Sequence, residues 1–170
     1  MAARIAGAAK IFAIDVVPER LALASELGAT RTIDGSKEDA LAVILAATGR
    51  GADFALDTTA VDAVVKQAVD CTGPLGTCGL IANKTPMQNA QVNILGSMLR
   101  GRTIRGIVQG DSVPDIFIPR LVDFFMDGKY PFDRLVKFYP FDDIATAMGD
   151  ADSGATRSEE HTSELQSHHD

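Results

Sequence analysis

Histidine is absent from residues 1–156, because the three histidines, His161, His168 and His169, all lie near the C-terminus. This absence excludes a Ser/His/Asp catalytic triad from that part of the chain. It also excludes every metal site that needs a histidine ligand. A clustered pair such as His168 and His169 is a weak, compositional signal for metal binding.

Cysteine is scarce, and long apolar runs are missing. Cys71 and Cys78 are too few for a disulfide framework and too far apart for a C-x-x-C motif, so we expect two buried free thiols. No apolar run is long enough to span a bilayer, and the first ten residues lack the apolar centre of a secretory signal. The net charge of −7 argues against nucleic acid and anionic membranes as partners. We therefore expect a cytoplasmic protein.

The residues that are present alternate between apolar runs of strand length and helical patterns. The expected strands are residues 11–15, 30–33, 53–57, 76–82 and 102–108, and the expected helices are residues 18–27, 37–48, 61–70 and 113–127. This alternation predicts an α/β fold with a doubly wound parallel sheet. The pairs Ser36–Asp39 and Ser112–Asp115 predict capped helix starts. Pro119 predicts a kink or a late start in the last helix.

The stretch "IFAIDVVPER", residues 11–20, ends a strand on Asp15 and starts a helix at Pro18. A carboxylate in this place accepts the hydroxyls of an adenosine ribose and repels a 2′-phosphate, which favours NAD over NADP. It is equally suited to cap the helix. A methyltransferase also places an acid here. Arg20 either lies over the adenine or is a solvated arginine in the first helical turn.

A second polar group follows the strand at residues 53–57. Asp57, Thr58 and Thr59 would lie at the carboxyl edge of the sheet, where ligands of open α/β sheets bind. Capping of the next helix by Thr59 fits the same residues. The glycine-rich turn G-x-G-x-x-G, which usually precedes an acid such as Asp15 by about 20 residues, does not occur in the sequence.

Four stretches together resemble one family: "KIFAIDVVPERLALASELGAT", "GADFALDTT", "GPLGTCGLI" and "GRTIRGIVQGDSVPDIFIPRLVDFFMDGKYPFDRLVKFYPFDDI". They are similar to the cofactor-binding half of zinc-dependent alcohol dehydrogenases of the medium-chain dehydrogenase/reductase superfamily. The last stretch resembles the aryl-alcohol dehydrogenase branch in particular. The resemblance covers about residues 2–154. It weakens the methyltransferase interpretation, because methyltransferases have no segment that corresponds to the last stretch.

The resemblance implies a Rossmann-like sheet that is incomplete, because the chain would begin inside the helix that follows the glycine loop. Residues 1–154 would then form a partial dinucleotide-binding domain without the first, central strand. In the strand order 3-2-1-4-5-6, the loss of strand 1 leaves two fragments of sheet, each with an unpaired inner edge. The strand and turn expected between residues 86 and 105 resemble the surface that pairs subunits, which implies a homo-oligomer.

The same resemblance implies a set of NAD contacts and no catalytic or metal-ligating residue within this chain. The implied cofactor-binding residues are Asp15, Arg20, Asp57, Thr58, Thr59, Ile81, Ala82, Asn83, Val108 and Gln109. Residues 81–83 would line the nicotinamide, and the backbone of residues 108–109 would meet its carboxamide. Ala60 stands where the family has glycine. Zinc would be bound only in the intact enzyme, by ligands outside this chain.

The function implied is hydride transfer between NAD and a small-molecule alcohol or aldehyde, aromatic alcohols included, with the isolated chain inactive. Two alternatives stay open: a stand-alone, non-catalytic nucleotide-binding or interaction module, and a methyltransferase fragment. Residues 155–170 are expected to form a disordered, artefactual tail. Residues 157–167 match the translation of a common sequencing adapter residue for residue. We therefore expect none of the three histidines of the tail to form a metal site.

Overall fold

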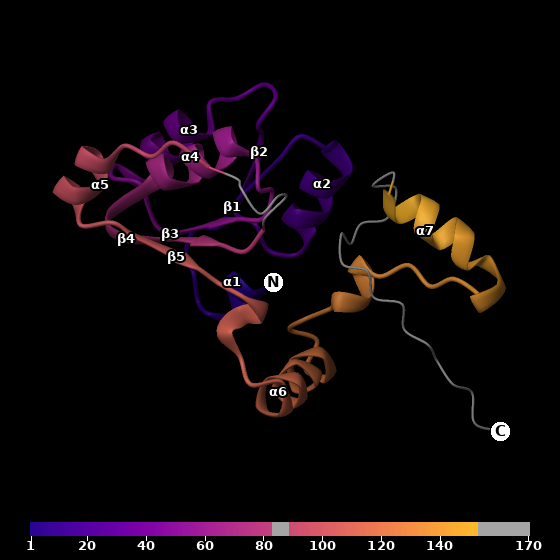
Figure 1. Cartoon of the computed structure of the whole chain (residues 1–170). Coiled ribbons are helices and arrows are strands. Elements are labelled where there is room, and N and C mark those ends of the chain that lie inside the picture. Colours follow the sequence, from indigo (N-terminus) through magenta and orange to yellow (C-terminus); the bar gives the residue numbers. More distant parts are fainter. Residues whose placement is uncertain (83–88, 153–170) are drawn as a thin grey trace.

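The computed structural model of the chain describes residues 1–82 and 89–152 (Figure 1). Expectations for Asn83 and for the tail at residues 155–170 lie outside the described residues. The strands are β1 (Phe12–Asp15), β2 (Arg31–Asp34), β3 (Ala52–Asp57), β4 (Thr72–Leu80) and β5 (Thr103–Gly106). The helices are α1 (Ala2–Ile5), α2 (Pro18–Glu26), α3 (Ala40–Thr48), α4 (Asp62–Cys71), α5 (Ile94–Arg100), α6 (Pro114–Met126) and α7 (Ile144–Asp152), with short 3-10 turns η1 (Gln109–Asp111), η2 (Phe132–Leu135) and η3 (Phe141–Asp143).

The strands form two separate parallel sheets, as the sequence predicts. One sheet pairs β1 with β2, and the other has the order β3-β4-β5. Asp15 lies opposite Asp34 in the first sheet, and Asp57 lies opposite Leu80 in the second. The carboxyl ends of paired strands therefore lie together, which sets the position of the candidate site. The prediction of an incomplete, Rossmann-like α/β sheet in two fragments is confirmed.

Local signals explain why the α3 helix begins and ends where it does. Asp39 is the N-cap, and its carboxylate accepts a hydrogen bond of 3.1 Å from the Ala42 amide. Gly49 ends the helix with φ +76°, a left-handed conformation that glycine adopts without a Cβ clash. The predicted start at residue 37 was three residues too early, because Ser36 instead donates its hydroxyl to Asp34.

The α6 helix begins at Pro114. Proline has no amide hydrogen, but this is not destabilising at the first helical position, because an amide there has no carbonyl of the helix to bind. The predicted capping pair is wrong here: the N-cap is Val113, without a side-chain bond, and Ser112 donates to the Gln109 carbonyl. The helix runs through Pro119, so the alternative of a late start is also wrong.

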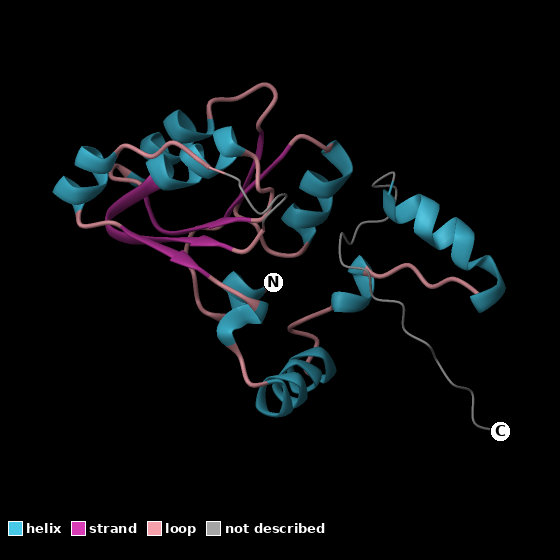
Figure 2. Cartoon of the chain, in the orientation of Figure 1, coloured by secondary structure: helices cyan, strands magenta, loops and turns pink. Residues whose placement is uncertain are grey.

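The core lies between the sheets and the helices α3 and α4 on one face, while α2 packs on β1 and β2 (Figure 2). Ile33 of β2 and Cys71 of α4 are buried together with Ala40 and Ile44 of α3. Leu23 is the buried residue of α2. Gly51 allows a close approach beside this core, because a Cβ there would lie 2.7 Å from the Cys71 carbonyl oxygen.

The second half of the chain differs from expectation. Neither α5 nor α7 was expected from the sequence, and a strand and turn were expected in the region where α5 forms. Figure 1 shows α6 and α7 set apart from the strands. Within residues 1–82 and 89–152, no helix combines the length and the apolar character that crossing a bilayer requires.

Candidate cofactor-binding site

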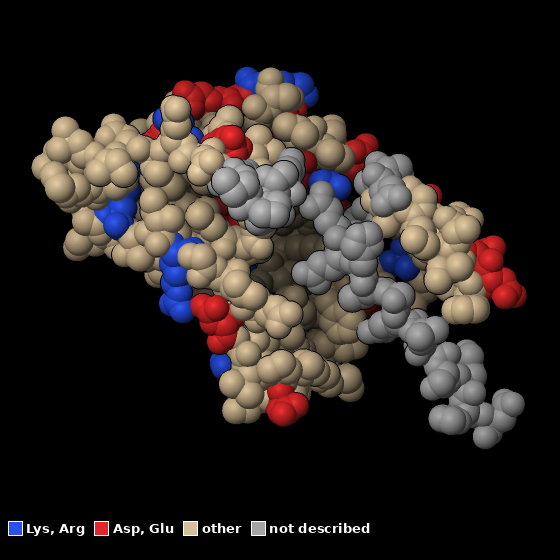
Figure 3. Space-filling view, viewed as in Figure 1, with Lys and Arg blue, Asp and Glu red and all other residues tan. Residues whose placement is uncertain are grey.

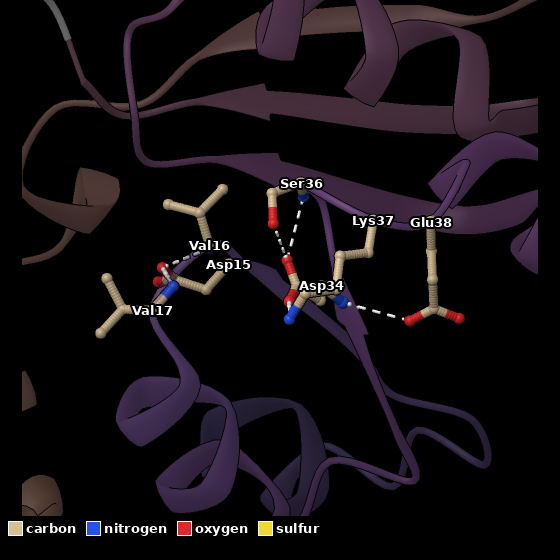
Figure 4. Close-up of polar contacts among 7 residues, drawn as sticks. All are labelled: Asp15, Val16, Val17, Asp34, Ser36, Lys37 and Glu38. Carbon is tan, nitrogen blue, oxygen red and sulfur yellow. Dashed lines mark hydrogen bonds and ion pairs between the residues drawn. The ribbon is translucent and has the colours of Figure 1, made fainter.

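Asp15 lies at the carboxyl end of β1, where the chain turns into α2 (Figure 4). Its Oδ1 atom accepts hydrogen bonds from the amides of Val16 at 2.7 Å and Val17 at 3.0 Å. Arg20 Nη1 lies 3.9 Å from the other oxygen, Oδ2. The N-cap of α2 is Val17, which has no side-chain cap bond, so the two bonds to Oδ1 hold the turn that precedes the helix. The other oxygen, Oδ2, lies on the partly exposed side of the carboxylate, near Arg20.

A second acidic strand end lies directly beside Asp15, although it is not among the site residues expected from the sequence. Asp34 ends β2, and its carboxylate contacts the Ser36 hydroxyl at 2.5 Å and Lys37 Nζ at 2.6 Å (Figure 4). The hydrogen bond from Lys37, followed by those from Ser36, lowers the pKa of Asp34 to about 2. The signal that identified Asp15, an apolar strand ending on an acid, is present at Asp34 as well.

Asp57 organises the turn that follows β3. Its side chain is 2% exposed. Oδ1 accepts from the amide and the hydroxyl of Thr59, at 3.3 and 2.9 Å, and Oδ2 accepts from the Ala60 amide at 3.1 Å. Both carboxylate oxygens thus hold the backbone of the turn. Thr59 in turn accepts from the Val61 amide at 3.1 Å, whereas the N-cap of α4 is Val61 itself, without a side-chain bond.

Ala60 adopts a left-handed backbone conformation with φ +51°. Residues with a Cβ rarely adopt this conformation, which costs roughly 1–2 kcal/mol relative to the right-handed region. The family pattern of a glycine in this place agrees with that geometry. The three hydrogen bonds to Asp57 hold the turn in this conformation despite the alanine.

The remaining expected contacts lie along the carboxyl edge of the three-stranded sheet. The Ile81 amide donates to the Asp57 carbonyl at 3.2 Å, which joins the end of β4 to the end of β3. The Ile107 amide donates to the Leu80 carbonyl at 2.9 Å, which joins β5 to β4. Val108, next along the chain, is exposed.

The turn after β5 is closed by Asp111. The Asp111 amide donates to the Val108 carbonyl at 2.9 Å, and Arg105 pairs with the Asp111 carboxylate at 2.7 Å. Gln109 has φ +48° in this turn. The backbone of residues 108–109 is therefore held in a fixed, exposed conformation.

The structure brings the expected residues together as two groups. Asp15 and Arg20 lie on the two-stranded sheet. Residues 57–59, 81–82 and 108–109 lie on the three-stranded sheet. A cavity of about 190 Å³, lined by Leu41, Leu45, Asp70, Asn93, Gly96, Arg100 and Arg102, lies at the opposite, amino edge of that sheet. That cavity is not part of the candidate site.

Zinc does not fit the described residues. Residues 1–82 and 89–152 contain no group of three or more histidine, cysteine or acidic side chains placed to hold a metal ion. Burial, reinforced by Asp70, raises the pKa of the Cys71 thiol to about 11, and burial also raises that of Cys78. Because zinc binds thiolates, these two protonated thiols suit packing rather than ligation.

Comparison with known proteins decides the family. Residues 1–126 match the sequence profile of the family described as zinc-binding dehydrogenase. The chain belongs to this family. Geraniol dehydrogenase of Castellaniella defragrans is 41% identical over 155 residues, which are 91% of this chain and 42% of that protein. The match confirms the resemblance to zinc-dependent alcohol dehydrogenases and removes the methyltransferase alternative.

Solved structures of zinc-binding dehydrogenases share the fold. An alcohol dehydrogenase zinc-binding domain protein from Burkholderia ambifaria is 49% identical, with a TM-score of 0.89 over 92% of this chain and 42% of that one. Benzyl alcohol dehydrogenase from Acinetobacter calcoaceticus is 42% identical, with a TM-score of 0.88 over 91% of this chain and 43% of that one. This zinc-binding dehydrogenase chain thus spans less than half the length of these relatives.

Proposed function

We propose that residues 1–154 are the cofactor-binding portion of an NAD-dependent, zinc-requiring alcohol dehydrogenase. The observation that carries the proposal is the Asp15 carboxylate, fixed at the carboxyl end of β1 by the amides of Val16 and Val17. The relatives act on geraniol and benzyl alcohol, as their names state, which supports an alcohol, aromatic alcohols included, as the substrate.

In this proposal Asp15 accepts the hydroxyls of the adenosine ribose through Oδ2. Oδ1 is already bound by two backbone amides, so the carboxylate cannot rotate away without losing both hydrogen bonds. A 2′-phosphate in the same place would meet a fixed negative charge, which makes NAD the preferred cofactor. Arg20 supplies a guanidinium plane for the adenine.

The three-stranded sheet would hold the nicotinamide half. Thr58, Ile81 and Ala82 follow the ends of β3 and β4 and present an edge of small and apolar groups, and residues 108–109 offer backbone groups for the carboxamide. Asp57 contributes by fixing the turn, since both its oxygens accept hydrogen bonds from that turn. When bound, the nicotinamide accepts the hydride that the alcohol gives up. The described residues do not fit zinc, so the zinc of the intact enzyme would be held by ligands outside them.

We expect this chain alone to oxidise no alcohol and to bind NAD no more tightly than about millimolar. The sequence contains no glycine-rich turn with a helix N-terminus to bind the pyrophosphate, and such a site supplies several backbone donors in dinucleotide-binding folds. Calorimetric titration of the purified chain with NAD tests this expectation. Micromolar binding would contradict it.

A chimera tests the proposed function itself. In it, residues 1–154 replace the aligned part of the geraniol dehydrogenase of C. defragrans, and NAD reduction is measured with geraniol and benzyl alcohol. We expect activity with NAD well above that with NADP. A folded chimera that binds NAD but oxidises neither alcohol would favour the alternative of a non-catalytic nucleotide-binding module.

In that chimera, Asp15→Ser should narrow the NAD preference about tenfold in kcat/KM, because the charge that repels the 2′-phosphate is removed. Asp34→Ser is the matched control: this acid ends the neighbouring strand in register with Asp15, and its loss should leave the preference unchanged. If Asp15→Ser left the ratio of kcat/KM values for NAD and NADP unchanged, Asp15 would serve only to hold the turn before α2.

We further propose that the intact enzyme is a cytoplasmic homo-oligomer that pairs through the region around α5. Four large apolar side chains of this helix are exposed: Ile94, Leu95, Met98 and Leu99. Figure 3 shows the surface over α5, at the left of the view, as mostly uncharged. An apolar, exposed helix of this kind is typical of a surface that another chain covers.

A further inference from the structure

The cavity at the amino edge of the three-stranded sheet combines an apolar wall with a cationic one. It lies among α3, α4 and α5, which are at the left of Figure 1. Leu41 and Leu45 of α3 are four residues apart, so they share one face of that helix and form the apolar wall. Arg100 and Arg102 also line the cavity. Its volume of about 190 Å³ is below the roughly 300–1,000 Å³ of pockets for drug-sized ligands, so it suits a small molecule.

The end of the α5 helix fixes Arg102 at this cavity. Gly101 ends the helix with φ +61°, and the Arg102 amide donates to the Ser97 carbonyl at 3.0 Å. The side chain reaches the end of α4, where Nη2 donates to the Asp70 carbonyl at 3.1 Å. Nε is buried and has no hydrogen-bond acceptor among the described residues. The described chain thus holds this guanidinium in place but offers it a neutral carbonyl rather than a carboxylate.

The positive charge at the cavity is not neutralised within residues 1–82 and 89–152. Neither Arg100 nor Arg102 forms an ion pair there, because the acid that lines the cavity, Asp70, pairs instead with Lys66 at 2.5 Å. Burial lowers the pKa of Arg102, and the positive charge of Arg100 lowers it further. Two guanidinium groups that repel one another at one cavity favour an anion beside them.

The α5 helix presents this site on one face and apolar side chains on the other. Asn93, Gly96 and Arg100 are spaced by three and four residues, so they share the face that lines the cavity. Asn93 Oδ1 accepts from the Gly96 amide at 2.7 Å, which leaves the NH2 group of Asn93 available to a ligand. The exposed apolar residues of α5 occupy the positions between them. The proposed subunit-pairing surface therefore does not include the cavity.

We propose that this cavity binds a small apolar monocarboxylate. The carboxylate lies against the guanidinium groups of Arg100 and Arg102, whose parallel N–H donors match its planar shape. The hydrocarbon part packs on Leu41 and Leu45. A phosphate fits less well, because it has no apolar part and because Asp70 repels its second negative charge. The ligand does not compete with NAD, since the expected cofactor residues lie at the carboxyl edge, and the proposal does not depend on the proposed function.

The test titrates the whole, isotope-labelled chain with sodium hexanoate. NMR follows the amide signals of Gly96 and Gly101 and the Nε–H signal of Arg102, and we expect all three to shift and to saturate. Two further ligands separate the parts of the site. Acetate keeps the charge without the hydrocarbon chain, and hexan-1-ol keeps the chain without the charge. Each should bind at least about tenfold more weakly than hexanoate.

Variants of the cavity wall should change the affinity in opposite directions. Arg100→Gln and Arg102→Gln each remove a charged donor and should weaken hexanoate binding about tenfold. Asp70→Asn removes the negative charge and should strengthen it about threefold. Arg120→Gln in α6 is the matched control, because it removes the same charge from a residue that does not line the cavity, and the affinity should stay unchanged. Circular dichroism checks the fold of each variant.

Several results would overturn the inference. Equal binding of hexanoate and hexan-1-ol would mean that the arginines bind no carboxylate, and equal binding of acetate or tighter binding of inorganic phosphate would mean that the leucines bind no hydrocarbon chain. Binding that survives both arginine substitutions would place the ligand elsewhere. If an arginine variant does not fold, the ligand series on the unmodified chain, together with Asp70→Asn, still decides.

Discussion

Residues 1–106 and residues 107–152 contain similar shares of apolar residues, but only the first region buries any of them. Every buried residue of the described chain lies between Leu23 and Gly79. The α3 helix has nine residues and buries Ala40 and Ile44, whereas α6 has thirteen, is mostly apolar, and buries none. Ile116, Ile118 and Val122 of α6 are all exposed.

The difference shows that a sheet face, rather than an apolar sequence, produces a core here. The α3 helix packs its apolar residues against Ile33 of β2, so that the helix layer and the sheet layer exclude water from the space between them. Contacts in residues 107–152 are mostly local, such as the rings of Phe125 and Phe132 with centroids 4.8 Å apart. An exposed ion pair between Arg134 and Glu26 reaches the first region, and such pairs contribute about 0–1 kcal/mol.

Ile33→Ala should therefore be the most damaging single change. Ile33 is fully buried, and its truncation removes apolar contacts and leaves a cavity. We expect the free energy of unfolding to fall by about 2–5 kcal/mol. Denaturant unfolding followed by circular dichroism measures the change.

Ile118→Ala in α6 is the matched control, because the same side chain is 58% exposed there. We expect a change within about 0.5 kcal/mol, as for ordinary surface substitutions. Comparable losses for the two variants would mean that α6 packs against the rest of the chain, and the contrast between the two regions would fail.

Each region has a turn in which an aspartate carboxylate accepts a hydrogen bond from a backbone amide: Asp57 in the first region and Asp111 in the second. Asp57→Ala should lower the free energy of unfolding by about 1–3 kcal/mol, because it leaves the buried Ala60 amide without its acceptor. Asp111 also accepts from an amide of its turn, that of Val108, but it is exposed. Asp111→Ala should cost less than about 1 kcal/mol. Equal losses by thermal unfolding would contradict the difference in burial.

Much of the first region could be predicted from the sequence. Parallel strands covered by helices appear as short apolar runs, so β1, β2, β3 and most of β4 lie where those runs predict them. The division into two sheets followed from the strand order and is confirmed. The expected start of β4 was residue 76, because Gly73 and Pro74 favour a turn, yet the strand begins at Thr72.

The helices α5 and α7 and part of the site could not be predicted from the sequence. The α5 helix is short and contains Gly96, so its sequence has no clear helical stripe. The role of Asp57 depends on which way its carboxylate turns, and the hydrogen bonds to Thr59 and Ala60 follow from the fold of the turn. Asp34 ends an apolar strand as Asp15 does, so the same sequence pattern could have identified it as a site residue.

The smallest expected effect concerns two surface ion pairs, one in each region. The hydrogen bond from Lys37 is the main cause of the low pKa of Asp34, which is about 2. Lys37→Gln should raise that pKa toward the ordinary value near 3.8, which NMR titration of the carboxyl group measures. Because the pKa is lower in the folded state, the pair stabilises the fold above about pH 3.8, and the contribution is lost as the pH falls toward 2.

Lys137 and Asp150 form the corresponding pair in the second region, with Nζ 2.7 Å from Oδ2. The hydrogen bond from Lys137, followed by that from Tyr139, lowers the pKa of Asp150, so Lys137→Gln should raise it. Asp34 directly follows the buried Ile33, so its protonation should alter global unfolding. Asp150 lies in the region without a core, and its protonation should leave global unfolding unchanged. If Lys137→Gln changed the pH dependence of global unfolding as much as Lys37→Gln does, residues 107–152 would unfold together with the core.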